Sequence, residues 1–325
     1  MLSVIVAYVN EYPQIVFTIR AIAEELRGRA DFEIIAVNNY CAEVEAQGRV
    51  QDKGAACIQA AAEGNPWLIP LEYDTKLSHW QAKNLGVRHA RGNIFWFPDA
   101  HVMLQRGSLY EMYQEYSETA PWLMPRPATY HMPIGYQILE WRKLIYALVA
   151  DPKIGRYFYQ FQPMPPETEP FEVPVMSTCG CMMHRSIYDK LGGWPEEIGI
   201  YGGGEPFFNF SMAVLGMQKR IWPKGFLFHH GEERGYHWNH DGWVRDELIA
   251  AYCFGGPKLM ELKAQNMDGH REVLQAIMLG ILQSKSIAVH RAGIEIQQVT
   301  TVEEWVQPWL KGKRGKGQLG QTGND

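Results

Sequence analysis

The sequence predicts an α/β protein with a mainly parallel sheet, helices on both faces of that sheet, and a helical C-terminal extension. In the first hundred residues, short apolar runs alternate with segments whose apolar residues recur at helical spacing. This alternation is typical of parallel sheets, because two parallel strands need a long, usually helical, connection. With 325 residues, 46% of them hydrophobic, the chain can bury one large core.

Most of the expected sheet comes from the first hundred residues. A strand is predicted over residues 2–8, and Pro13 suits the first turn of the helix that follows. Apolar residues then repeat at helical spacing at Ile15, Ile19, Ile22 and Leu26. Further strands are expected over residues 32–37, 67–71 and 93–97, and further helices up to about residue 62 and over residues 78–90.

The rest of the chain divides into a middle segment and a C-terminal part. Residues 121–172 are rich in Pro, Tyr and Met and lack a regular period. We interpret them as an insertion that shapes a binding site or as a surface excursion. Residues 1–240 are predicted to form the main domain and residues 241–310 a helical extension. Residues 311–325 are Gly-rich and polar, which predicts a disordered tail.

Composition excludes several classes of protein. A formal net charge of -5 argues against a surface built throughout to attract nucleic acid or acidic membranes. The five cysteines are odd in number, and Cys179 and Cys181 form C-x-C rather than the C-x-x-C of zinc ribbons and redox sites. A reduced, cytoplasmic protein is therefore expected. No apolar run reaches the roughly 20 residues of a membrane-spanning helix, so no membrane span is expected.

Polar residues directly follow three of the predicted strands. They are Asn10, Glu11, Asn38, Asn39, Asp99 and His101. Ligands of parallel α/β sheets bind at the carboxyl ends of the strands, so these residues are candidates for a binding site. An Asp and a His two positions apart can offer a carboxylate oxygen and an imidazole nitrogen to Mn²⁺ or a similar cation. Alternatively, Asp99 caps the next turn and His101 is merely exposed.

Four stretches of sequence carry a family resemblance. Residues 3–11 combine a strand with Asn10-Glu11, residues 82–92 read AKNLGVRHARG, residues 95–101 read FWFPDAH, and residues 179–194 contain CGCMMHR and LGGW. In this order they resemble the family-2-type glycosyltransferases of GT-A fold. That family has a nucleotide loop, an A-R-N-x-G-x-x-x-A-x-G helix, a D-x-D metal motif and a G-x-x-M-x-x-R…G-G-F segment. The resemblance runs from Ser3 to about His229, with residues 121–172 unmatched.

The D-x-H form of the motif at Asp99 and His101 is similar to that of the polypeptide N-acetylgalactosaminyltransferases. In that group, a Gly-Gly-Glu segment and a later His complete the site. Here Gly203-Gly204-Glu205 and His229 occupy matching positions. The resemblance therefore implies Asp99, His101 and His229 as ligands of Mn²⁺ or Mg²⁺, with His230 as the alternative to His229.

The resemblance also implies a GT-A fold, a nucleotide-diphospho-sugar donor and an acceptor with a hydroxyl group. It assigns the donor contacts to Ala7, Val9, Glu11, Asn38, Asn39, Lys83, Asp99 and Ala100. A cation bound to the diphosphate would stabilise the charge of the leaving group. Glu205 would deprotonate the acceptor in an inverting reaction and position it in a retaining one.

The sequence departs from the family pattern at two places. Asn38-Asn39 stands where an Asp pair commonly contacts the nucleotide, so base and ribose contacts would run through amides. Glu205-Pro206 replaces the usual Glu-Asp, which leaves one acid. For Glu205, the alternative to a catalytic role is a carboxylate at the start of a helix.

Other functions compete with glycosyl transfer. One is a metal-dependent hydrolase built on His229, His230, His237 and His240, and another is a non-catalytic sugar-binding module. The acceptor is also open: a saccharide, a lipid-linked sugar, a protein side chain and a hydroxylated base in DNA each offer a hydroxyl group. The lack of an expected membrane span makes the lipid-linked sugar less attractive. A DNA acceptor would need a basic groove, for which the basic residues between Lys311 and Lys316 are the one hint.

Overall fold

The structure is a computed structural model that describes residues 1–135, 143–230 and 234–312. The predicted disordered tail lies outside these ranges except for its first two residues.

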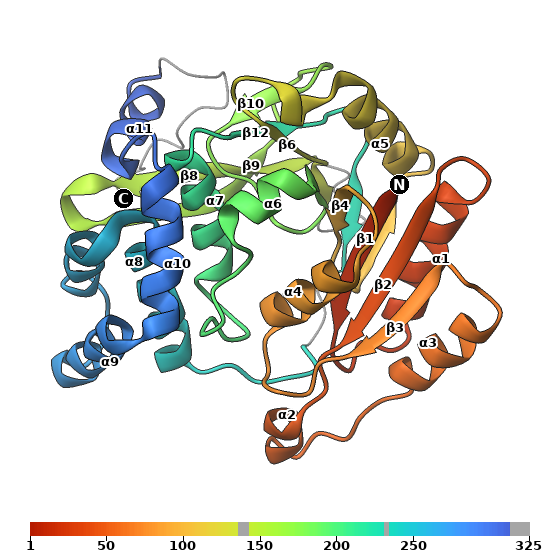
Figure 1. The fold of residues 1–325 in the computed structure, drawn as a ribbon, viewed down its shortest axis with the longest axis horizontal. Helices are drawn as coiled ribbons and strands as arrows, with labels where there is room; N and C mark the ends of the chain where they lie inside the picture. Colours follow the sequence, from red (N-terminus) through yellow and green to blue (C-terminus); the bar gives the residue numbers. More distant parts are fainter. Residues whose placement is uncertain (136–142, 231–233, 313–325) are drawn as a thin grey trace.

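A central sheet of eight strands forms the middle of the molecule (Figure 1). In spatial order these are β10 (Phe171–Val173), β12 (Gln218–Ile221), β6 (Ala128–His131), β11 (Cys181–His184), β4 (Ile94–Phe97), β1 (Leu2–Tyr8), β2 (Phe32–Asn38) and β3 (Leu68–Glu72). All of these strands except β10 and β11 run in the same direction. The prediction of a mainly parallel sheet is confirmed.

The strands of the first hundred residues are mostly apolar because both faces of the sheet are covered. Along β1, Val4 and Val6 pack into one core, whereas Ile5 and Ala7 pack into a second core on the other face. Successive side chains of a strand point to opposite faces, so a strand between two layers of helices is apolar at most positions. The buried polar side chains of Ser3 and Glu33 bond to each other.

A second, smaller sheet lies beside the first. Its strands, in spatial order, are β5 (Val102–Leu104), β13 (Leu227–His229), β7 (Ile134–Gly135), β8 (Leu144–Asp151) and β9 (Arg156–Pro163). The predicted insertion over residues 121–172 therefore lies only partly outside the central sheet. It supplies β6 and β10 to that sheet, and β7, β8 and β9 to the second one.

Helices cover both faces of the central sheet. They are α1 (Gln14–Leu26), α2 (Ala42–Ala46), α3 (Gly54–Glu63), α4 (His79–His89), α5 (Ser108–Thr119), α6 (Arg185–Leu191) and α7 (Gly204–Val214), with short 3-10 turns η1 (Pro121–Leu123) and η2 (Pro152–Ile154). Helix α4 packs on β1 and β2, and its first turn is capped by the Ser78 side chain. Helix α1 contacts α3 and α5. The weak helical pattern before residue 62 is two helices, α2 and α3.

The C-terminal part is helical, as predicted. It consists of α8 (His240–Ala264), α9 (Arg271–Gln283), α10 (Lys285–Gln297) and α11 (Val302–Leu310). These helices gather on the side of the molecule away from β3 and α3 (Figure 1), and α8 packs against α7 and α10. In the described part of the chain, no single helix has the length and hydropathy to cross a membrane. Helices α9 and α10, bent by 71°, meet those criteria only as a pair.

Candidate active site

A cavity of about 320 Å³ lies at the carboxyl ends of β1 and β4. Ala7 and Asp99 face each other in a parallel bridge, which brings the residues after both strands to the same edge of the sheet. Most residues of the predicted site line this cavity: Ala7, Val9, Glu11, Asn39, Lys83, Asp99, Ala100, His101, Glu205 and His229. The structure therefore gathers residues that lie up to 222 positions apart in the sequence.

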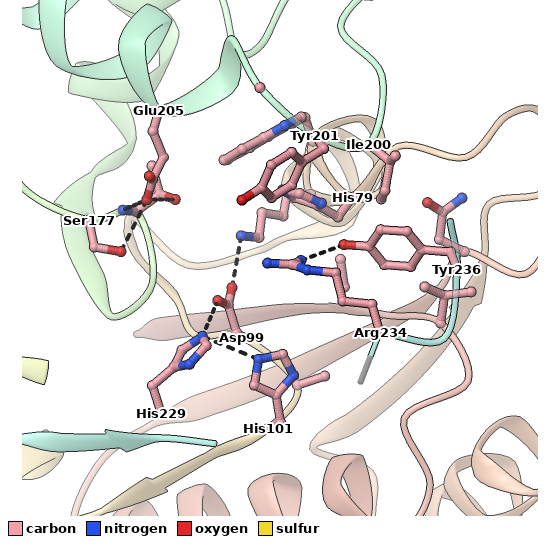
Figure 2. A pocket seen from close by; sticks show the side chains of 18 of the residues that line it. His79, Asp99, His101, Ser177, Ile200, Tyr201, Glu205, His229, Arg234 and Tyr236 are labelled. Carbon is pink, nitrogen blue, oxygen red and sulfur yellow. Dashed lines mark hydrogen bonds and ion pairs between the residues drawn. The ribbon is translucent and has the colours of Figure 1, made fainter. Parts of the chain in front are cut away.

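Asp99, His101 and His229 point toward one another (Figure 2). Asp99 lies two residues beyond β4, and His229 is the last residue of β13. The pairing of β13 with β5 places His229 opposite Val102, next to His101. His229 Nε2 lies 3.1 Å from Asp99 Oδ2 and 3.2 Å from His101 Nε2. One nitrogen atom of His229 thus faces both other predicted ligands.

These separations suit neighbouring ligands of one cation. Two ligand atoms bound at right angles, each about 2.1 Å from a divalent ion, lie about 3.0 Å apart. The distances from His229 Nε2 to Asp99 and to His101 are close to this value. A carboxylate oxygen with two imidazole nitrogens also matches the chemistry of Mn²⁺ and related ions.

Glu11 orients the His101 ring. Glu11 Oε1 lies 2.6 Å from His101 Nδ1, and Glu11 Oε2 accepts a hydrogen bond from the Val9 backbone N–H. A carboxylate at Nδ1 holds the ring proton there and leaves the Nε2 lone pair facing His229. Burial opposes charge on this ring, but the hydrogen bond and charge of Glu11 raise the pKa of His101.

Two cations lie close to Asp99. Lys83 Nζ is 3.4 Å from Asp99 Oδ1, and the Lys83 side chain is buried. Arg234 is held by a hydrogen bond to the Tyr236 hydroxyl and lies over the Tyr201 ring. Burial alone would raise the pKa of Asp99, but Lys83 and His229 hold it well below its usual range. Asp99 is therefore ionised, beside positive charge that can attract an anion.

Glu205 lies elsewhere on the cavity wall, in the first turn of α7 (Figure 2). Its Oε1 atom accepts hydrogen bonds from the Ser177 hydroxyl at 3.1 Å, and from the Thr178 backbone N–H at 3.0 Å and hydroxyl at 3.3 Å. Oε2 accepts a longer bond, 3.4 Å, from the Tyr146 hydroxyl. These donors fix the direction of the carboxylate.

The two adjacent asparagines make structural hydrogen bonds. Asn38 does not line the cavity, and its amide donates to the Glu72 carboxylate. Asn39 is buried. Its amide donates to the backbone oxygens of Tyr73 and Lys76, and its side-chain oxygen accepts from the Ser78 backbone N–H. These bonds hold the loop that leads into α4.

Several cavity residues were missed by the sequence analysis. Arg234 and Tyr236 come from a segment without regular structure, and aromatic side chains come from β8 and β9: Tyr146, Phe158, Tyr159 and Phe161. Period-two alternation of aromatic residues in β9 is the one sequence signal that could have identified part of this wall. No local pattern marks Arg234.

Cys179 is a further neighbour of Asp99. One possible ligand atom from each of Asp99, Cys179 and His229 lies within 4.8 Å of the other two. The pairing of β11 with β4 sets Cys181 opposite Phe97, and the left-handed backbone of Gly180 turns the preceding residue, Cys179, toward the other face of the sheet. The C-x-C spacing gave no reason to expect this proximity.

The histidines of the competing hydrolase hypothesis do not form one cluster at the cavity. Among the described cavity residues, His229 is present, whereas His230, His237 and His240 are absent. His237 bonds to Gln47 through its backbone and approaches Arg49, and His240 begins α8 with an exposed side chain.

Comparison with known families agrees with this fold. The family model described as glycosyl transferase family 2 matches residues 3–192, more than half of the chain. The chain belongs to glycosyl transferase family 2. The matched region contains the Asp99 motif and the strand that follows Cys179, and it ends before Glu205 and His229. No curated protein sequence matches this family member significantly.

Solved structures share its fold at low sequence identity. A structure of GalNAc-T7 with UDP, GalNAc and Mn²⁺ has a TM-score of 0.67 and 12% identity, and the match covers 94% of this chain and 56% of GalNAc-T7. S. aureus TarS 1-349 with UDP has a TM-score of 0.52 at 12% identity, with coverages of 86% and 70%. A mannosyltransferase from Pyrobaculum calidifontis, PcManGT with GDP-Man and Mn²⁺, has a TM-score of 0.50 at 16% identity, with coverages of 91% and 85%. The family 2 member thus has a GT-A fold and spans little more than half of GalNAc-T7.

Proposed function

We propose that this protein transfers a sugar from a nucleotide-diphospho-sugar to an acceptor hydroxyl, with a divalent cation held by Asp99, His101 and His229. The observation that carries the proposal is the convergence of these three side chains in a cavity that also contains Glu205. Membership of family 2 supports the reaction class. The Mn²⁺, UDP and GDP-Man in structures of similar fold support the cation and the donor class.

The cation, when bound, would act as a Lewis acid on the diphosphate and stabilise the negative charge of the leaving group. The chain's own cations would assist this. Lys83 and Arg234 lie beside Asp99 and would pair with the remaining phosphate oxygens. Glu11 would keep the His101 ring in the tautomer that binds the cation.

Glu205 is proposed to receive the acceptor. Hydrogen bonds from Ser177, Thr178 and Tyr146 fix the orientation of its two oxygens. In this orientation the carboxylate would also accept a hydrogen bond from a hydroxyl group in the cavity. In an inverting reaction, the acceptor oxygen would attack the anomeric carbon while its proton passes to Glu205. The bond from that carbon to the diphosphate oxygen would break. In a retaining reaction, the same contact would position the acceptor.

The acceptor is proposed to be a hydroxyl-bearing saccharide, protein side chain or modified DNA base. No contact in the described residues separates these three. The basic tail residues that would favour DNA lie, except Lys311, outside the described ranges.

A donor screen tests the proposal. UDP-, GDP- and CDP-sugars are added with Mn²⁺, and the melting temperature is measured, because a bound ligand stabilises the folded state by RT ln(1+[L]/Kd). One donor class should raise the melting temperature and be hydrolysed or transferred in a Mn²⁺- or Mg²⁺-dependent way. Asp99→Ala and His229→Ala should remove both effects. Failure of every nucleotide-sugar to bind would contradict the proposal and favour a module of another function.

A further inference from the structure

Cys179 offers a sulfur atom close to two of the proposed cation ligands, Asp99 and His229, whereas His101 is not part of this group. Its candidate ligand atom and those of Asp99 and His229 all lie within 4.8 Å of one another. Ligand atoms on opposite sides of a cation, each at about 2.1 to 2.3 Å, are separated by about 4.2 to 4.6 Å. The bound of 4.8 Å exceeds this span by only a few tenths of an ångström, so small side-chain movements would bring all three atoms onto one ion.

The position of Cys179 is fixed by the fold. Gly180 N–H donates to the Phe97 carbonyl at 2.7 Å, and the Cys179 carbonyl lies 2.6 Å from His131 Nε2. The Cys179 N–H donates to the Ser177 hydroxyl. These contacts on both sides hold Cys179 near Asp99, with its side chain only 3% exposed.

The neighbouring Cys181 shows that this placement is specific. Cys181 lies two residues along the chain, but it packs in the hydrophobic core on the other side of the sheet from Cys179. Cys181 is not part of the candidate metal group, which contains Cys179, Asp99 and His229. Only one thiol of the C-x-C pair therefore faces the cation ligands in the described structure.

We propose that Cys179 is an additional cation ligand, so that the site binds thiophilic ions such as Zn²⁺ and Cd²⁺ through sulfur. This inference rests on the proposed function, because it uses the same cation site. Binding would form a metal–sulfur bond and break the S–H bond, and the proton would pass to solvent. Thiolate ligands favour Zn²⁺ and similar ions, whereas Mn²⁺ prefers oxygen and nitrogen. Zn²⁺ would then compete with Mn²⁺ for the proposed site.

The test is a titration of the full chain with Cd²⁺, read by the ultraviolet charge-transfer absorption of a Cd²⁺–thiolate bond. The wild type should gain this band with one equivalent of Cd²⁺. Cys179→Ala should lose it, and its Cd²⁺ affinity should fall at least about 100-fold because one ligand is gone. Mn²⁺ binding by Cys179→Ala, measured by electron paramagnetic resonance, should change less than about threefold, because Mn²⁺ gains little from sulfur.

Two controls make the result decisive. Cys57→Ser changes a partly exposed thiol on α3 and should keep the band. Asp99→Asn should weaken Cd²⁺ binding and reduce the band, because both ligands hold the same ion. Absence of the band from wild-type protein that binds Mn²⁺ would overturn the Cys179 proposal and leave the proposed function standing. Absence of both Cd²⁺ and Mn²⁺ binding would overturn both. If Cys179→Ala does not fold, the wild-type band together with its loss in Asp99→Asn decides the question.

Discussion

Two aspartates near the cavity, Asp99 and Asp246, have opposite electrostatic environments. Asp99 lies beyond β4 next to Lys83 and His229, which hold its pKa well below the usual range although burial opposes this. Asp246 lies in α8, where its side chain is 1% exposed and bonds to Arg245 and the Gly199 backbone N–H. Burial there outweighs these partners and raises the pKa of Asp246 to about 6.

Asp99 is the proposed cation ligand, whereas Asp246 stabilises the fold. Both carboxylates have a cationic partner, so the presence of a partner does not distinguish them. Asp99 also faces His229 Nε2 and remains about one-third exposed at the cavity, where an ion can reach it. Asp246 is enclosed and holds the loop at Gly199, which precedes Tyr201 and the glycines before Glu205. The predictions below test this difference.

Asp99→Asn should have the largest effect. The change removes the charged ligand while keeping the size of the side chain, and metal activation of a leaving group is worth several kcal/mol. We expect at least about a 10³-fold loss of transfer rate, together with loss of Mn²⁺ binding. Both are measured by initial rates and by titration. Asp268→Asn, a change at an exposed aspartate, is the matched control, and an unchanged rate in Asp99→Asn would contradict the assignment.

Glu205→Gln should lower the transfer rate by about 10²- to 10⁴-fold if this carboxylate takes the acceptor proton. Mn²⁺ and donor affinities should stay within about threefold of wild type, because Glu205 lies apart from the cation ligands. The two effects are separated by single-turnover rates and donor titration. Glu63→Gln, at an exposed position of α3, serves as the control. Equal losses of donor binding and of rate would instead place Glu205 in the donor site.

Glu11→Gln should have a smaller effect on the Asp99 site. The amide keeps an oxygen for His101 Nδ1 but removes the charge that orients the ring. Loss of such a partner of a metal ligand weakens metal binding by about 10- to 100-fold. The concentration of Mn²⁺ that gives half-maximal activity reports this change. The maximal rate at saturating Mn²⁺ should recover most of its wild-type value, and no change in the Mn²⁺ requirement would count against the role of Glu11.

Asp246→Asn should change the pH dependence of stability and leave Mn²⁺ binding intact. The pKa of Asp246 is raised from 3.8 to about 6, so the folded protein keeps a proton that the unfolded chain releases between these values. In wild type this lowers the free energy of unfolding as pH rises from about 4 to about 6, by roughly 3 kcal/mol in total. The variant lacks this contribution. Urea unfolding at several pH values compares the two slopes, and parallel slopes would contradict the raised pKa.

The parts of the fold with regular sequence patterns could be predicted. The apolar run of β1, the capped helix α4 and the strand before Asp99 each carry a local signal. These signals were enough to predict which residues meet at the carboxyl edge of the sheet. The aromatic cavity wall formed by β8 and β9 could not be predicted from the sequence. Its strands pack partly on the central domain and partly face the cavity, so Phe158 and Phe161 are exposed while Tyr157 is buried.

The candidate site was predictable where its residues directly follow strands, as for Asp99 and His101. His229 was predicted as a ligand from a family resemblance and not from its spacing in the sequence. Donor contacts of Asn38 and Asn39 stay a prediction: the hydrogen bonds described for both are made within the protein, and Asn39 also lines the cavity. The proximity of Cys179 to Asp99 depends on the pairing of β11 with β4 and on the turn at Gly180, which no local pattern reveals.

The central claim is that Asp99, His101 and His229 hold one cation. The most direct measurement is a titration of the full chain with Mn²⁺, followed by the electron paramagnetic resonance signal of the free ion. We predict one site per chain, lost in Asp99→Asn and in His229→Ala and retained in Asp268→Asn. Equal Mn²⁺ binding by the wild type and by both site variants would contradict the account.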